Sequence, residues 1–164
     1  MRTPPPVSIN DYLGEPITVT EVVFPRIETY LMRFRHSFNL FSPHVDDIRG
    51  TRPLIIGQRY EISLVPIILP TPAAILVKFV EDQGCTFTGI SGLLNLYHQH
   101  PELFTPHNGR YIVSMVNDKS VNDFPRISIP PCRHAQVNFG FHTVISGRRN
   151  DFHSSSIVLL FKEL

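Results

Sequence analysis

The sequence lacks the short motifs that mark the common catalytic sites. It contains no Gly-rich phosphate loop, no nucleophile elbow, no HExxH and no paired CxxC. It also lacks an apolar run of the roughly 18 residues that a membrane span needs. The longest such stretch, residues 64–80, is broken by three prolines. We therefore expect no enzyme, no cofactor, no transmembrane segment and, from the polar N-terminus, no secretory signal.

Cysteine is scarce, and its spacing is uninformative. Cys85 and Cys132 are the only two, and neither lies in a metal-binding or redox motif. The sequence therefore favours a reduced, intracellular protein with two free thiols. A single disulfide between them stays open as an alternative.

Charge is sparse, and one cation dominates it. Charged residues make up 18% of the chain and the net charge is +1, which excludes nucleic-acid binding driven by bulk charge. Arginine outnumbers lysine by 12 to 3. Because the planar guanidinium pairs with carboxylates and phosphates, the excess indicates contact surfaces. A compositional bias without function is the alternative.

Two arginine pairs are the candidate anion-binding residues. Arg33 and Arg35 alternate on one face of a predicted strand, and Arg148 and Arg149 lie in a predicted turn. Clustered cations can bind RNA phosphates or anionic lipid headgroups without a large net charge. The plainer interpretation of each pair is a solvated strand face.

Alternating apolar residues predict strands along most of the chain. In residues 17–24, Ile17 and Val19 alternate with Thr18 and Thr20, the pattern of a half-buried strand. Further strands are predicted at residues 26–40, 59–64, 74–80, 110–116, 136–145 and 155–161. Two hairpins are expected, one across residues 69–73 and one across residues 147–151.

One short helix is predicted near residues 90–99. Ile90, Leu93, Leu94 and Tyr97 recur at helical spacing, and Pro101 follows. The expected fold is mainly β (α+β), an antiparallel sheet that is sandwich-like or a partly closed barrel. At 164 residues the chain fits one domain, here residues 17–164.

Residues 1–16 form a Pro-rich N-terminal arm, expected to be extended and partly polyproline II. We predict that this arm mediates self-association. The residues proposed for this contact are Pro4, Pro5, Pro6, Tyr12 and Leu13.

Five histidine and cysteine residues are candidates for a chemical site. His98, His100, His107, Cys132 and His134 do not follow the paired spacing of common zinc sites. A Cys132–His134 nucleophile pair on one strand face has no evident third group to orient the base. We therefore expect surface histidines, no metal and no catalytic residue.

From residue 59 onward the order of elements resembles that of rhabdovirus matrix proteins, specifically the short, plant-infecting kind. The resemblance is carried by YEISLVPIIL, by FTGISGLLNLYHQHPELFTPHNGRYIVSMV, by RISIPPCRHAQVNFGF and by the apolar final strand. It implies a structural protein of the virion and host cytoplasm that self-associates. It also implies contacts with the viral nucleocapsid and RNA, and with an anionic membrane surface, but with no small-molecule substrate.

Two other classes stay open. One is another viral β protein, such as a small capsid or movement protein. The other is a small-ligand-binding β-barrel, in which Phe79, Phe139 and Phe141 would line a cavity.

Overall fold

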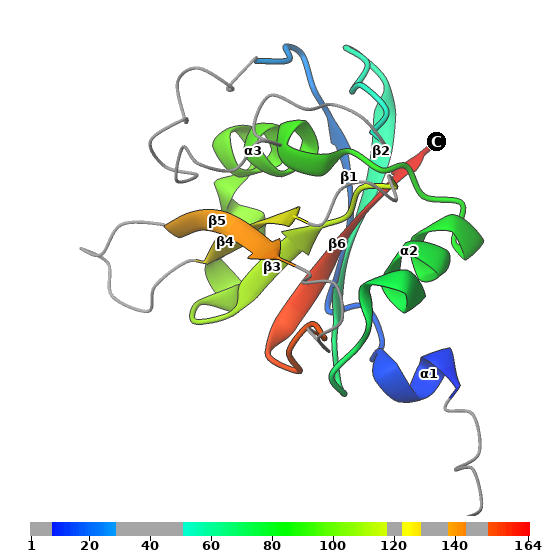
Figure 1. The fold of residues 1–164 in the computed structure, drawn as a ribbon. Helices are drawn as coiled ribbons and strands as arrows, with labels where there is room; N and C mark the ends of the chain where they lie inside the picture. Colours follow the sequence, from blue (N-terminus) through cyan, green and yellow to red (C-terminus); the bar gives the residue numbers. More distant parts are fainter. Residues whose placement is uncertain (1–7, 29–50, 118–122, 129–137, 144–150) are drawn as a thin grey trace, which may run out of the picture.

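A mixed sheet with the strand order β1-β2-β6-β3-β4-β5 forms the centre of the computed structural model, which describes residues 8–28, 51–117, 123–128, 138–143 and 151–164. The strands are β1 (Thr18–Val23), β2 (Arg59–Pro66), β3 (Tyr111–Ser114), β4 (Asp123–Ser128), β5 (Asn138–Thr143) and β6 (Ser156–Glu163). The helices are α1 (Ile9–Tyr12), α2 (Ala73–Asp82) and α3 (Gly89–Gln99), followed by the 3-10 turns η1 (Pro101–Leu103) and η2 (Thr105–His107). The predicted α+β class with prominent strands is confirmed, and the sheet is open (Figure 1).

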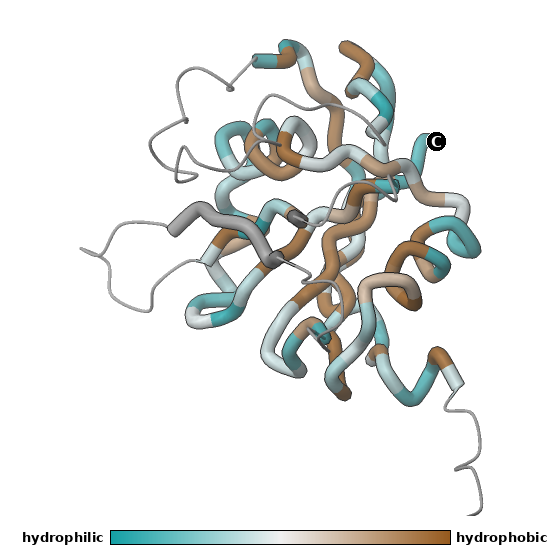
Figure 2. Tube along the Cα trace, in the orientation of Figure 1, coloured by the Kyte–Doolittle hydropathy of each residue, from teal (hydrophilic) through white to brown (hydrophobic). Residues whose placement is uncertain are grey.

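The C-terminal strand β6 lies in the middle of the sheet. It pairs antiparallel with β2 and parallel with β3, while β5 pairs only with β4 among the described strands. The predicted hairpin across residues 147–151 is therefore wrong. Every residue from 156 to 161 is buried, and in Figure 2 much of this strand is coloured hydrophobic. A continuous apolar run of this kind is typical of a strand covered on both faces, which a hairpin edge is not.

Helix α2 replaces the strand predicted at residues 74–80, and the hairpin predicted across residues 69–73 is absent with it. The segment AAILVKFVED fits both the strand and the helix period. Ile75, Val77 and Phe79 alternate as in a strand, while Leu76 and Val80 lie one helical turn apart. Leu76 and Val80 are the buried pair. Pro72 immediately precedes the helix, and Lys78 pairs with Asp82 at 3.4 Å.

Helix α3 confirms the helix predicted near residues 90–99. It lies against β3 and β4, and both Leu93 and Leu94 are buried as expected, together with Leu96. Asn95 is fully buried on the same helix. Its side chain accepts a bond from the N–H of Glu28 at 3.0 Å and donates to the carbonyl of Glu28 at 3.2 Å. The amide therefore fastens the chain after β1 onto α3.

Two apolar clusters lie on opposite faces of the sheet. The first cluster contains Leu93 and Leu96 of α3 with Ile62, Leu64 and other sheet residues. The second contains α2 residues with Val65 and Val158, the alternate positions of the same strands. Figure 1 shows α3 on one side of the sheet and α1 with α2 on the other.

Strand β1 exposes the residues whose alternation predicted it. Ile17 is 46% exposed and Val19 is 56% exposed, whereas Thr18 and Thr20 are half-buried. The register with β2 determines which row of β1 is covered. The covered residues Thr18, Thr20 and Val22 lie opposite residues of the core, which are Leu64, Ile62 and Tyr60. An apolar strip of β1 is consequently left in contact with solvent.

Two proline-containing segments differ from their predicted conformation. In the described part of the N-terminal arm, α1 is a short helix, because Ser8 and Asp11 form a capping box at its start. The strand β4, which contains Pro125, was not predicted. The pairing of β4 with β3 extends from Ser128 to Arg126. Pro125 lies just beyond it, where no N–H is needed for a bond to β3. The predicted strand 26–40 falls mostly outside the described residues.

Candidate functional site

A groove of about 590 Å³ lies on the α2 face of the sheet. Residues of the arm from Ile9 to Pro16 line one part of it, and Phe79 and Gln83 of α2 line another. Strands β2 and β6 contribute the sheet residues. The groove residues Glu61 and Ser63 of β2 are paired with Glu21 and Val19 of β1, so the groove adjoins the exposed strip of β1. Phe79, expected to line a cavity from a strand, lines this groove from a helix.

The sheet residues of the groove change from apolar to charged along the strands. Near one end lie Val65 and Leu160, which belong to the α2-side cluster. At the other end Glu61 is paired across the strands with Lys162. The groove therefore offers an apolar section of the sheet beside a charged pair, and Glu15 of the arm adds a second carboxylate to its lining. That arrangement suits an amphipathic ligand or chain segment.

Cys85 lines the groove near this charged end. It is a free thiol, and burial raises its pKa, while Lys162 lowers and Glu61 raises it by smaller amounts. A thiol whose pKa is raised is mostly protonated at neutral pH and is a poor nucleophile. Its surroundings give it a packing role. Cys132, the other cysteine, lies outside the described residues.

Tyr12 and Leu13, two of the predicted self-association residues, lie against the end of β2 in their own chain. Leu13 is only 7% exposed and forms a bridge with Ile67. The carbonyl of Tyr12 accepts a bond from the N–H of Ile68 at 2.7 Å, and the N–H of Gly14 donates to Pro66 at 2.9 Å. This docking position of the arm is thus defined by both side-chain burial and backbone pairing. Pro4, Pro5 and Pro6 lie outside the described residues.

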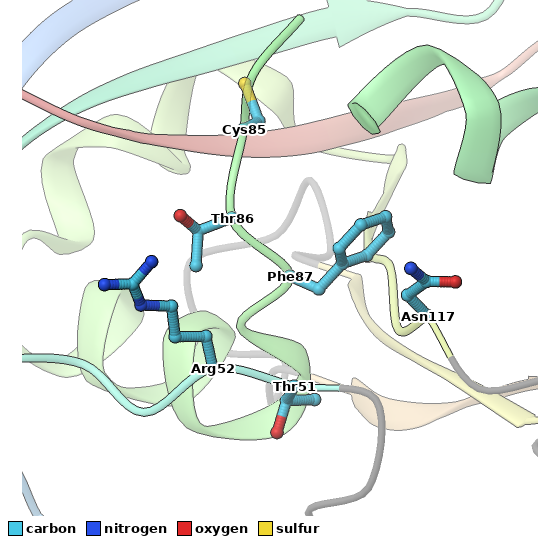
Figure 3. Close-up of a pocket in the computed structure, with 6 residues that line it drawn as sticks. All are labelled: Thr51, Arg52, Cys85, Thr86, Phe87 and Asn117. Atoms are coloured by element: carbon cyan, nitrogen blue, oxygen red, sulfur yellow. The ribbon is translucent and has the colours of Figure 1, made fainter. Parts of the chain in front are cut away.

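A second, shallower pocket of about 310 Å³ lies beside residues 85–87 (Figure 3). Figure 3 shows Arg52 on one side of this segment and Asn117 on the other. Arg52 forms an ion pair with Glu163 at 3.1 Å, and Asn117 donates to Glu81 at 2.9 Å. Because these polar groups are already engaged within the chain, the pocket offers little for an anion to bind.

The candidate zinc ligands His98, His100 and His107 lie in the described part of the chain and do not form a metal cluster there. His98 is exposed, and His100 lies 3.4 Å from a carboxylate oxygen of Glu102. In the described part of the chain, no three metal-binding side chains cluster. Cys132 and His134 fall outside that part. His107 contradicts the expectation of a surface residue, because η2 turns it inward, where it is 5% exposed and its Nε2 lies 3.4 Å from Thr18 Oγ1.

His107 predicts a specific acid sensitivity. Its pKa is lowered because burial disfavours the charged imidazolium, with Arg110 adding repulsion. As the pH falls below about 6.5, the ordinary value for histidine, the unfolded chain takes up a proton before the folded protein does. We expect the free energy of unfolding to decrease with acidification in that range and level off below the lowered pKa.

Urea unfolding at a series of pH values checks the role of His107. In a plot of the free energy of unfolding against pH, His107→Gln should remove the decrease that begins near pH 6.5. The decrease at lower pH, which comes from protonation of carboxylates, should remain. The exposed His153→Gln is the matched control and should keep the wild-type slope. Equal slopes for wild type and His107→Gln would contradict the role given to His107.

The predicted anion-binding residues Arg33, Arg35, Arg148 and Arg149 lie outside the described residues. The groove and the exposed face of β1 were missed by the sequence analysis. The sequence did contain a signal for the exposed face of β1. Ile17, Val19 and Val23 form one apolar row, and Val22 and Phe24 make the opposite row apolar at its end. Only the register with β2 decides which row is covered.

In the described part of the chain, no helix has the length and apolar character needed to cross a bilayer. Comparisons of the chain with protein families, with curated proteins and with solved structures find no match.

Proposed function

We propose that the chain is a viral structural protein of the matrix type, which self-associates and bridges the ribonucleoprotein to the inner face of the membrane. The proposal starts from the resemblance of the region from residue 59 onward. The observation that carries the self-association is the docked arm. Leu13 is buried against the end of β2, and only Glu15 and Pro16 separate the Gly14 bond to Pro66 from the Ile17 bond to Leu64.

An arm attached in this way can exchange between copies. The bonds from Gly14 and Ile68 and the burial of Leu13 are local contacts at one end of the sheet. The same contacts form whether the arm belongs to the same chain or to a neighbour, so exchange requires no new interface. The contact with RNA or anionic lipid rests on the four predicted arginines and on the arginine excess.

The groove favours a second candidate, a binding protein for a small amphipathic ligand. Its volume of about 590 Å³ lies within the range of ligand sites, and its lining combines Val65 and Leu160 with Lys162. A ligand-binding protein of this kind stays monomeric at all concentrations, whereas a matrix-type protein forms larger assemblies as its concentration rises.

Deleting residues 1–13 is expected to lower the oligomer mass. The deletion removes Leu13, whose burial stabilises by roughly 1.5–3 kcal/mol, so the truncated protein should also be less stable while remaining folded. Light scattering after size-exclusion chromatography measures the mass, and circular dichroism checks the fold.

Two controls accompany the deletion. Removing residues 1–7 keeps the docked segment and separates its contribution from that of the prolines. Ile56→Ser replaces a residue that is 63% exposed and tests whether losing any surface apolar group has the same effect. An unchanged oligomer mass after deleting residues 1–13 would rule out the arm as the self-association element.

A further inference from the structure

Strand β1 is the end strand of the sheet, and its outer side has no neighbouring strand among the described residues. Such an edge presents a row of backbone N–H and C=O groups that can pair with another strand. Natural proteins usually protect an edge with charged residues, bulges or proline within it. β1 is a six-residue strand, TVTEVV, with one charged residue.

That charge is neutralised within the chain. The carboxylate of Glu21 accepts a bond from the guanidinium of Arg59 on β2 at 2.9 Å. The neighbouring positions on the same face are apolar, with Ile17 at 46%, Val19 at 56% and Val23 at 42% exposure. The edge therefore combines free backbone groups with exposed apolar side chains and carries no unpaired charge.

We propose that β1 pairs antiparallel with β1 of a second copy of this chain, joining two sheets across a two-fold axis at Thr20. The inference deepens the proposed self-association by naming its surface. It does not depend on the arm, whose docking position lies on β2.

The position of the axis follows from the sequence of the strand. Directly opposed residues in an antiparallel pair have their side chains on the same face of the sheet. A two-fold axis perpendicular to the sheet keeps this arrangement only if it passes through a residue, which then lies opposite its own symmetry mate. An axis at Glu21 would set two carboxylates against each other and draw Pro25 into the pairing. An axis at Val19 would draw in Pro16, which has no N–H to donate. The axis at Thr20 centres the pairing on residues 18–22 of β1, which include no proline and oppose no like charges. Ile17 lies before the strand, and its N–H already donates to the carbonyl of Leu64 at 2.8 Å.

This register is also complementary in its side chains. Ile17 lies opposite Val23 of the second copy, and Thr18 lies opposite Val22 of the second copy. Thr20 meets its own symmetry mate, and hydroxyl-bearing pairs of this kind are favourable across strands. Val19 lies opposite Glu21 of the second copy, whose charge is paired with Arg59, so no like charges are opposed. Val19 of each copy also lies diagonal to Val19 and Val23 of the other, which continues the exposed apolar row across the axis. The self-pairing of Thr20 and this shared apolar row favour a second copy as the occupant of the edge. A single strand pair buries little area, so the dimer is weak and depends on concentration.

Charge reversal at the axis provides the test. Thr20→Lys and Thr20→Glu each place like charges directly opposite each other, and each should raise the dimer dissociation constant about fivefold or more. An equimolar mixture of the two variants should recover dimer as a heterodimer. Sedimentation velocity over a range of concentrations measures all three samples. In the wild type, hydrogen exchange should slow with rising concentration at those amides of β1 that face away from β2, and not at those already bonded to β2.

Two further variants make the result specific. Val19→Lys places its ammonium opposite Glu21 of the second copy, so dimerisation should persist, whereas an axis at Val19 would oppose two ammonium groups. Ser154→Lys is the control, a hydroxyl-to-lysine change at an exposed turn, and should leave the dissociation constant unchanged.

The outcomes separate this inference from the proposed function. An assembly that is lost on deleting residues 1–13 but insensitive to both Thr20 variants overturns the β1 pairing and leaves the proposed function standing. A wild type that is monomeric at every concentration overturns both. Monomers whose β1 amides become protected only by an unrelated extended peptide would assign the edge to a foreign strand and also overturn the pairing.

Discussion

Replacing Leu94 with alanine is expected to lower the free energy of unfolding by about 2–5 kcal/mol. Leu94 is 1% exposed on α3, a helix that lies against β3 and β4. The substitution loses the transfer free energy of the side chain and leaves a cavity that a packed helix can only partly close. Chemical denaturation followed by circular dichroism measures the change as a shift of the midpoint.

Leu69→Ala is the matched control for this prediction. Leu69 is 44% exposed in the loop after β2, so its truncation should change the free energy of unfolding by about 0.5 kcal/mol or less. If Leu94→Ala were no more costly than Leu69→Ala, the burial of Leu94 on α3 would be incorrect.

The second large effect is expected at Asn95. Asn95→Leu keeps the side-chain volume close to constant but removes the acceptor for the N–H of Glu28 and the donor to its carbonyl. Leaving such groups unpaired costs about 1–3 kcal/mol each where water cannot reach them. Because Glu28 is only half-buried, we expect a total loss of about 2–4 kcal/mol.

Hydrogen exchange locates this loss. The amide of Glu28 should exchange faster in Asn95→Leu than expected from the change in global stability, since the chain after β1 is released from α3. Asn117→Leu is the control, because its exposed amide bonds only Glu81 and its loss should cost little. Unchanged exchange at Glu28 would argue against Asn95 as the fastening residue.

The sequence was informative where one period was unambiguous. In α3 the spacing of Leu93, Leu94 and Tyr97 fits only a helix, and the strand at residues 59–64 buries Tyr60, Ile62 and Leu64 as predicted. In α2 the period was ambiguous, because Ile75, Val77 and Phe79 alternate as in a strand while Leu76 and Val80 follow the helical period. Contacts with the sheet, which are nonlocal, decide between the two.

The pairing of strands that are far apart in the sequence could not be predicted from local residue patterns. Nothing near residues 147–151 signals that β6 pairs with β2, which begins almost a hundred residues earlier, instead of with β5. The groove likewise depends on the arm, α2 and β6 meeting on one face. The exposed row of β1 was visible as apolar residues, but its exposure follows only from the register with β2.

The central place of β6 has a consequence for synthesis of the protein. The ribosome releases β1 to β5 before β6, and until then β2 and β3 have no strand between them. The nascent chain therefore holds two separate half-sheets, each with an extra uncovered edge and apolar face. Such species are prone to aggregation and are bound by chaperones. The fold closes in one late step, so a ribosome that stalls before residue 156 yields a product with no route to the native sheet.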